Sequence, residues 1–169
     1  MSDASLLTGL PPIAAPDARV LILGSFPSVA SLAAGQYYAH KQNAFWPIMG
    51  ALFGAGRELD YSDRTLKLQT SGVAIWDVLC RCKRSGSLDA DIDRSSERPN
   101  NFGEFFDSHP DLRVIAFNGR KAAECFRRHV NALLPSLCVG HTLPSTSPAN
   151  ASWPFERKLE VWRMTIGEC

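Results

Sequence analysis

Aromatic, basic and amide side chains crowd into one short stretch of this chain, YYAHKQNAFW, at residues 37–46. Within it, Tyr38 lies in a polar context beside His40, Lys41 and Asn43. A tyrosine in such a loop can offer its ring face to a planar ligand, and base–aromatic stacking is worth about 1–3 kcal/mol. The stretch therefore predicts a binding site for a flat heteroaromatic ligand.

Two further stretches carry groups that could contact a ligand. GSFPS, at residues 24–28, is neither a dinucleotide fingerprint, nor a phosphate loop, nor a nucleophile elbow. It can supply backbone N–H groups and a rigid proline turn. STSPAN, at residues 145–150, is rich in small hydroxyls, which commonly form turns and cap helices. Beside free backbone amides, the same hydroxyls also bind phosphate, so both roles stay open for this stretch.

The composition is that of an ordinary globular protein: 45% of the 169 residues are hydrophobic and 21% are charged. This length predicts one domain over residues 1–169, with a Pro-rich extended arm at residues 1–18. The formal net charge of +1 permits a nucleic-acid partner but does not require one. No apolar run is long enough to span a membrane, and the N-terminus lacks the features of a secretory signal. We therefore expect a cytoplasmic protein, associated with the nucleoid if it is bacterial.

The cysteines form an odd set with only one C-x-C pair among them. This spacing suits reduced thiols better than disulfides or a four-ligand metal cluster. We therefore expect no metal site and no cofactor. The five cysteines are Cys80, Cys82, Cys125, Cys138 and Cys169.

Stretches of two kinds alternate along the chain and must position these groups. Short aliphatic runs read as strands buried on both faces: Arg19–Gly24, Gly72–Asp77, Arg113–Asn118 and Leu137–Thr142. Segments with helical spacing lie between and after them: Phe45–Phe53, Phe102–Ser108, Lys121–Leu134 and Pro154–Ile166. Phe45 and Trp46 begin the first of these helices, and core packing is the more common role for such aromatics.

The alternation predicts βαβ units, and hence an α/β protein: a three-layer α/β/α sandwich around a central four-stranded parallel sheet. Ligands of such proteins bind at the carboxyl ends of the strands. We therefore expect GSFPS after the first strand, FNG after the third and STSPAN after the fourth to converge with residues 37–46 in one crevice.

Three motifs in this order resemble those of a known family: G-S-F-P-S-x-x-S-L, then Q-Y-Y-A-H-K-Q-N-x-F-W, then S-T-S-P-A-N before the final helix. The tracts G-V-A-I-W-D-V-L and G-S-L-D-x-x-I fit the same pattern. Together they resemble the hypoxanthine-DNA glycosylase branch of the uracil-DNA glycosylase superfamily, from Val20 to Trp162. The resemblance implies a three-layer sandwich with a four-stranded parallel sheet, and excision of damaged bases from DNA in base excision repair.

Two departures from the wider superfamily follow from this resemblance. GSFPS stands where uracil enzymes have G-Q-D-P-Y and mismatch-specific enzymes have G-I-N-P-G, so Phe26 replaces their water-activating residue. STSPAN stands where uracil enzymes have H-P-S-P-L-S. Ser145 then matches their transition-state histidine and Ala149 their intercalating leucine, which leaves the DNA wedge unidentified.

The resemblance also assigns roles to residues of this chain. A-H-K-Q-N-A-F-W is similar to H-P-A-N-R-F-W of mismatch-specific enzymes, which implies that Asn43 supplies the missing polar group and orients a water toward C1′ of the sugar. Tyr38 falls on the base-stacking aromatic, and Asn118 on an asparagine that reads the base edge. Backbone amides around Ser25 and Phe26 would take the charge that develops on the departing base.

His40 is the rival catalytic candidate, because an imidazole could protonate the leaving base. The residues implied to contact the base are Gly24, Ser25, Phe26, Tyr38 and Asn118. Those implied to contact DNA are Ser28, Lys41, Ser145, Thr146, Ser147, Pro148, Ala149 and Asn150. Lys41 is the one lysine on a matched motif, and a Schiff-base lyase would need a neutral amine close to the sugar carbon, so we expect a monofunctional, metal-free hydrolase.

Three other functions stay open at this point. The chain could be a uracil or G·T/G·U mismatch glycosylase with a permissive pocket. It could be a module that senses base lesions without cleaving them, because Phe26 replaces the usual acid or amide. It could also hydrolyse small nucleotides on a similar α/β framework. We expect the protein to be a monomer.

Overall fold

Four parallel strands form the centre of the computed structural model, which describes residues 5–168. Residues 1–4 of the expected N-terminal arm and Cys169 lie outside the described residues. The strand order is β3-β2-β6-β7, and each neighbouring pair is parallel. This arrangement confirms the predicted sheet, with each strand within two residues of its expected bounds. The strands are β2 (Val20–Gly24), β3 (Val73–Asp77), β6 (Val114–Asn118) and β7 (Val139–Leu143).

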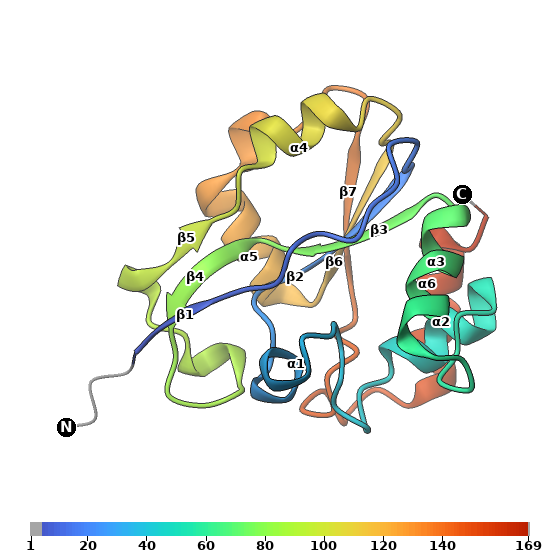
Figure 1. Cartoon of the computed structure of the whole chain (residues 1–169), viewed down its shortest axis with the longest axis horizontal. Helices are drawn as coiled ribbons and strands as arrows, with labels where there is room; N and C mark the ends of the chain where they lie inside the picture. Colours follow the sequence, from blue (N-terminus) through green and yellow to red (C-terminus); the bar gives the residue numbers. More distant parts are fainter. Residues whose placement is uncertain (1–4, 169) are drawn as a thin grey trace.

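Helices cover both faces of this sheet, as the continuous burial of β2 and β3 requires. In Figure 1, α2, α3 and α6 form one layer, while α4 and α5 lie across the sheet from them. Phe102 of α4 packs against both Trp76 of β3 and Phe126 of α5, with ring centroids 5.0 and 5.7 Å apart. The three-layer sandwich is thus confirmed. The helices are α1 (Val29–Ala34), α2 (Phe45–Phe53), α3 (Tyr61–Thr70), α4 (Phe102–Ser108), α5 (Arg120–His129) and α6 (Phe155–Ile166).

A second, antiparallel sheet was not predicted. Its order is β1-β4-β5, formed by Leu6–Thr8, Leu79–Lys83 and Arg98–Pro99. The arm is therefore tied down: β1 pairs with β4, and Ile13 bridges Ile75. Strands of two to five residues with mixed polarity have little periodicity, so their pairing depends on distant partners.

The helices depart from the prediction in three places. The segment predicted as one helix over Lys121–Leu134 ends at His129, because Val130 leaves the helical region at φ −130° and a separate 3₁₀ turn, Asn131–Leu133, follows. α1 was missed because it has only six residues, and α3 because its sequence YSDRTLKLQT is largely polar. Two further 3₁₀ turns, Asp89–Asp91 and Arg94–Ser96, shape the loop between β4 and β5.

Buried indole groups connect the core to the loops at the strand ends. Phe45 and Trp46 are fully buried, so both act as core aromatics. The Trp46 indole N–H donates to the carbonyl of Tyr37 at 2.9 Å, and the Trp162 indole N–H donates to the carbonyl of Pro144 at 3.0 Å. These bonds anchor the segments that begin just after Tyr37 and Pro144.

Cys80, Cys82, Cys125 and Cys138 are free thiols in the structure. Burial raises the pKa of both Cys82 and Cys125 to about 11, which keeps these thiols protonated and unreactive near neutral pH. Within residues 5–168, no helix is both long and apolar enough to cross a membrane, and no group of three or more His, Cys, Asp or Glu side chains could hold a metal ion.

Candidate functional site

A pocket of about 1010 Å³ opens at the carboxyl ends of the parallel strands. Figure 1 shows that β2 leads from this end of the sheet into α1. The lining residues of the pocket lie within residues 24–31, 37–43, 87–90, 118–121 and 142–153, together with Asp77 and Val161. Every site residue predicted from the sequence lines it except Lys41, which is exposed outside the lining. The crevice expected at the strand ends is therefore present, and it brings these residues together.

Two polar groups approach the backbone closely where β2 ends at Gly24. A Cβ atom at Gly24 would collide with a carboxylate oxygen of Asp77 and lie 3.2 Å from the hydroxyl oxygen of Tyr38. Gly24 and Asp77 are partners in the β2–β3 register, so the strand pairing itself sets this approach. Only glycine leaves room for both groups at this floor of the pocket.

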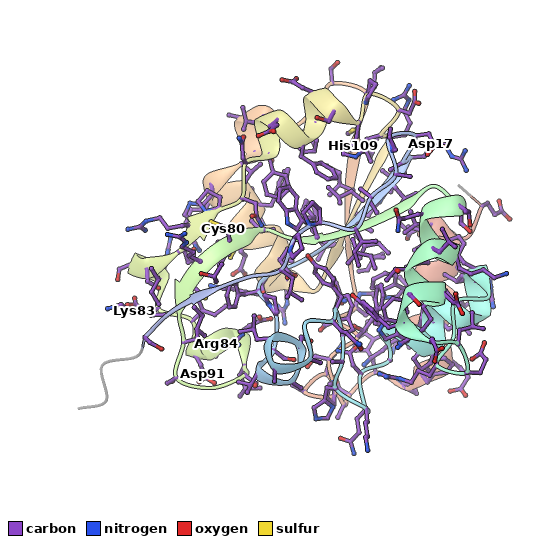
Figure 2. All side chains as sticks on the ribbon, in the orientation of Figure 1. Asp17, Cys80, Lys83, Arg84, Asp91 and His109 are labelled. Carbon is purple, nitrogen blue, oxygen red and sulfur yellow. The ribbon has the colours of Figure 1, made fainter. Side chains whose placement is uncertain are left out.

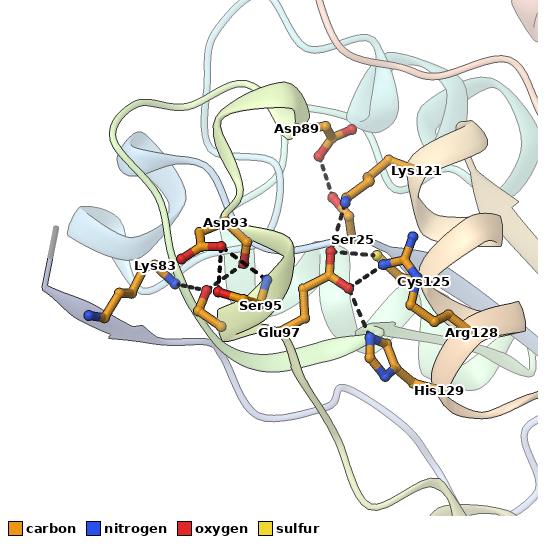
Figure 3. Close-up of polar contacts among 11 residues, drawn as sticks. Ser25, Lys83, Asp89, Asp93, Ser95, Glu97, Lys121, Cys125, Arg128 and His129 are labelled. Carbon is orange, nitrogen blue, oxygen red and sulfur yellow. Dashed lines mark hydrogen bonds and ion pairs between the residues drawn. The ribbon is translucent and has the colours of Figure 1, made fainter.

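The GSFPS loop presents backbone donors and an apolar side chain. The N–H groups of Ser25 and Phe26 bond to no acceptor within residues 5–168. The Ser25 hydroxyl donates to the carboxylate of Asp89, as Figure 3 shows. Ser28 caps α1, its hydroxyl oxygen accepting from the Ser31 N–H at 3.2 Å. Phe26 is buried and has no ionisable group, so this loop can stabilise a developing negative charge but cannot activate water.

Tyr38 takes a left-handed backbone conformation, at φ +54°. Its ring stacks on Phe45 with a centroid separation of 3.9 Å, so the core holds the ring at the pocket wall. The hydroxyl is buried and has no hydrogen-bond partner among the described residues. Burial and the nearby Asp77 carboxylate raise the pKa of Tyr38 against the opposing effect of the Asn118 side chain, which keeps the hydroxyl protonated. The phenol is thus an unused donor inside the pocket.

Asn43 is held by the start of α2. Its Oδ1 accepts from the Phe45 N–H at 2.9 Å, which fixes the amide plane. A carbonyl oxygen has two lone pairs, so one still remains for a water molecule. Arg57, which the sequence reasoning missed, donates to the carbonyls of His40 at 2.8 Å and Asn43 at 3.3 Å. This guanidinium rigidifies the loop that carries both catalytic candidates.

His40 is exposed and lines the pocket. Its Nδ1 accepts a hydrogen bond from the Gln42 N–H at 3.1 Å, so Nδ1 carries no proton in this arrangement. The remaining ring nitrogen, Nε2, is then the proton carrier available to a ligand.

Asn118 fastens the STSPAN segment to the end of β6. Its Nδ2 donates to the Thr146 hydroxyl and its Oδ1 accepts from the Thr146 N–H, both at 2.9 Å. The amide is therefore largely used in holding the loop, and its contact with a base stays a prediction. Further bonds shape the turn: Ser145 and Ser147 hydroxyl oxygens accept from the N–H groups two residues on, at 3.2 Å. α6 begins only at Phe155, so the helix-capping role considered for this segment is wrong.

Asp77 is the principal pocket residue that sequence reasoning missed. It is 4% exposed, and its Oδ2 has no hydrogen-bond partner among residues 5–168. Burial and the nearby Asp89 carboxylate raise the pKa of Asp77 to about 7, against the opposing effect of Arg84. Near neutral pH the carboxyl is therefore partly protonated and can both donate and accept hydrogen bonds. The sequence could have pointed to Asp77, because this residue ends a predicted strand, as Gly24 and Asn118 do.

Arg84 lies beside Phe26 of the pocket wall. Its guanidinium lies 5.3 Å from the Phe26 ring centroid, and its Nε and Nη2 have no hydrogen-bond partner in the described chain. Burial lowers the pKa of Arg84, while Asp89 and Asp91 partly restore it. Figure 2 places Arg84 and Asp91 in the same loop after β4. The cation thus balances the acids around the pocket.

Glu97 ties the loop after β4 to helix α5 (Figure 3). Its carboxylate is fully buried and accepts from Lys121 at 2.7 Å, from His129 at 2.8 Å and from Arg128. Burial alone would raise the pKa of Glu97, but these hydrogen bonds outweigh it and lower the pKa to about 2. Burial likewise would lower the pKa of Lys121, yet Glu97 raises it. The one lysine in the pocket lining is therefore a charged ammonium, unsuited to attack a sugar carbon.

Comparison with known proteins extends the likeness over nearly the whole chain. The model of the uracil DNA glycosylase superfamily matches residues 11–165. A protein of Methanosarcina acetivorans named hypoxanthine DNA glycosylase is 34% identical over 154 residues, which are 90% of this chain and 93% of that protein. A protein of the same name from Methanosarcina barkeri is 35% identical over 117 residues, 69% of this chain and 73% of the relative.

The fold agrees with the sequence comparison. The solution NMR structure of a provisionally named uracil DNA glycosylase from Methanosarcina acetivorans has a TM-score of 0.81 at 31% identity. The alignment covers 97% of this chain and 98% of the other. With the family match spanning most of the chain and the pocket at the expected strand ends, this protein belongs to the uracil DNA glycosylase superfamily.

Proposed function

We propose that this protein is a monofunctional DNA glycosylase that hydrolyses the N-glycosidic bond of hypoxanthine in DNA, releasing the free base. The observation that carries the proposal is the joint placement of Tyr38, Asn43 and Asp77 around one pocket. Membership of the superfamily makes DNA the substrate class. The two curated relatives described above, both named hypoxanthine DNA glycosylase, support the choice of base. All the residues involved belong to one chain, so we propose that a monomer is sufficient.

The target nucleotide must leave the helix to reach this pocket. Flipping costs a few kcal/mol, and less for a mispaired base such as a deaminated one. Once inside, the base would lie at Tyr38, whose ring the Phe45 stack already holds in place. A preformed ring loses little freedom on binding, which favours stacking of a planar base.

Asp77 would read the edge of the base. Hypoxanthine presents an N–H donor next to a carbonyl acceptor, so it pairs with a group that both accepts and donates. A protonated carboxyl does both, whereas a carboxylate can only accept. The unpartnered Oδ2 of Asp77 is a buried polar group of the pocket floor that such an edge would satisfy.

Bond breaking would precede attack by water. If the C–N bond breaks early, the sugar becomes oxocarbenium-like and a weak nucleophile suffices. The free lone pair of Asn43 Oδ1 would orient that water, since the other holds the Phe45 N–H. Backbone N–H groups of Ser25 and Phe26 would stabilise the departing base. His40, through Nε2, is the alternative proton donor to the base.

The test is chromatography of bases released from labelled duplexes that contain deoxyinosine, uracil, xanthine or a G·T pair. We expect hypoxanthine to be the best product and Asn43→Ala to abolish most release. Asn131→Ala, at an exposed position outside the pocket lining, is the matched control. Tight binding without any released base would instead identify a lesion-binding module, and activity on free nucleosides a small-molecule hydrolase.

A further inference from the structure

One large apolar side chain stands at the rim of the pocket. Leu88 is 54% exposed and lines the pocket. The other large hydrophobic residues that are exposed in the described chain do not line it; they are Leu6, Val29, Leu66, Leu133, Leu137, Val139, Phe155 and Met164. Leu88 is therefore the exposed apolar group that a DNA duplex would meet when it docks over the pocket.

The backbone on both sides of Leu88 is fixed to the pocket wall. The Ser87 hydroxyl oxygen accepts from the Val29 N–H at 3.2 Å, and the Leu88 N–H donates to an Asp91 carboxylate oxygen at 3.2 Å. Asp89 accepts from the Ser25 hydroxyl, as Figure 3 shows. Both neighbouring acids are thus engaged within the protein, and the loop carries an exposed apolar side chain on a rigid base.

The opposite rim has no comparable group. The segment before α6 carries Ala149 and Asn150, which are short, and its one large side chain, Trp153, packs under the Arg157 guanidinium at 4.3 Å. Proteins that open a duplex commonly insert an exposed apolar side chain between base steps. Among the described residues that line the pocket, Leu88 is the exposed side chain of this kind.

We propose that Leu88 is the DNA wedge, which enters the base stack at the place vacated by the flipped nucleotide and keeps it open. The inference rests on the proposed function, since it needs a flipped base in the pocket. A leucine in the stack replaces part of the lost stacking surface with apolar contact. The Ser25–Asp89 bond couples the wedge loop directly to the GSFPS wall of the pocket.

The test compares Leu88→Ala with Leu133→Ala, a leucine of nearly equal exposure, 53%, outside the pocket lining. Each variant is assayed in single turnover on a duplex with deoxyinosine opposite thymine and on the same strand without its complement. We expect Leu88→Ala to slow excision from the duplex about tenfold or more, the factor for one lost leucine contact. Excision from the single strand should be unchanged, and Leu133→Ala should match the parent on both. Leu88→Met should restore duplex activity, because it keeps an apolar side chain of similar reach.

A second readout separates the wedge from the chemistry. With 2-aminopurine beside the deoxyinosine, its fluorescence should rise on binding of the parent protein and of Leu133→Ala, but not of Leu88→Ala. Equal duplex rates and equal fluorescence for Leu88→Ala and the parent would overturn the proposal, as would an equal loss on single-stranded DNA. If the parent opened the duplex in a Leu88-dependent way but released no base, the glycosylase function would fail and the wedge would stand.

Discussion

The Asp77 carboxyl group lies against the backbone of Gly24, where the paired strands β3 and β2 end. This contact leaves no space for a side chain at Gly24, and it holds a buried carboxyl with an unpartnered oxygen at the floor of the pocket. Strand pairing, a glycine and an acid from distant parts of the sequence thus build one polar surface for a base edge.

Gly24→Ala should displace Asp77 and Tyr38 from the pocket floor. We expect base release to fall about 10²-fold, since misplacement of reacting groups by about 1 Å has that effect. Unfolding free energy should fall by about 1–3 kcal/mol because of the overpacking. Gly103→Ala in α4 is the control, because its Cβ would meet only Asn101 Oδ1 at 3.7 Å. Single-turnover rates and urea melts check both changes; a fully active Gly24→Ala protein would show that the close approach is unimportant.

Asp77→Asn should change how excision depends on pH. If the protonated carboxyl donates to the base, the parent rate should fall as pH rises through about 7, the pKa of Asp77 in the folded protein. Asparagine also donates and accepts, so the variant should keep part of the activity and lose this limb. Rates between pH 5 and 9 for both proteins, measured on single-stranded deoxyinosine DNA, decide the matter. A parent profile that is flat across pH 7 would contradict the role.

The same group should also make stability depend on pH. Its folded pKa of about 7 lies above the unfolded value of about 3.9, so the folded state binds more protons between these values. The contribution is fully present below about pH 4 and is lost as pH rises through 7. The parent should therefore lose stability relative to Asp77→Asn between pH 4 and 8, as seen in paired thermal melts. Asp107→Asn, at an exposed site in α4, is the matched control, and its stability should follow that of the parent across this pH range.

Glu97→Gln should loosen the segment that carries Leu88 and Asp89. Removing one partner of a buried ion pair costs about 3–5 kcal/mol, and the partly exposed cations here favour the lower end. The Glu97 pKa is lowered to about 2, so its contribution is present above the unfolded pKa and is lost as pH falls toward 2. Urea melts at pH 7 and pH 3 should show a larger difference between parent and variant at pH 7 than at pH 3. Glu124→Gln, exposed on α5, should behave like the parent.

Asn43 has a structural and a proposed catalytic task, which two substitutions separate. Asn43→Ala removes both the acceptor of the Phe45 N–H and the water-orienting oxygen, so we expect about 10²-fold slower excision and about 1 kcal/mol less stability. Asn43→Asp keeps an acceptor for the Phe45 N–H, so its stability should equal that of the parent while a part of the activity survives. Equal rates for the alanine variant and the parent would remove Asn43 from the mechanism.

Local patterns were sufficient for the framework of the fold. Strands buried on both faces must be continuous aliphatic runs, which is why β2, β3 and β6 were recognisable, and parallel strands must end at one edge. β7 was expected to be buried on both faces as well, but as the edge strand of the sheet it is exposed at its first four residues. The placement of Tyr38 and Asn43 in one pocket follows from that rule and from their motif. The small sheet and α1 were missed because they are short, and α3 because it is largely polar.

What this sequence determined by itself was the class of fold, the edge at which the site lies and the loops that reach it, because each depends on local periodicity or on the end of a strand. Tertiary structure alone decided the environment of each polar group. Four features depend on contacts between segments that are far apart in the chain. They are the raised pKa of Asp77, the ion pairs of Glu97, the hydrogen bond from Arg57 to the His40 carbonyl, and the hydrogen bond from Asn118 to Thr146. Burial and charge at a site are sums over such contacts, and no stretch of sequence contains them on its own.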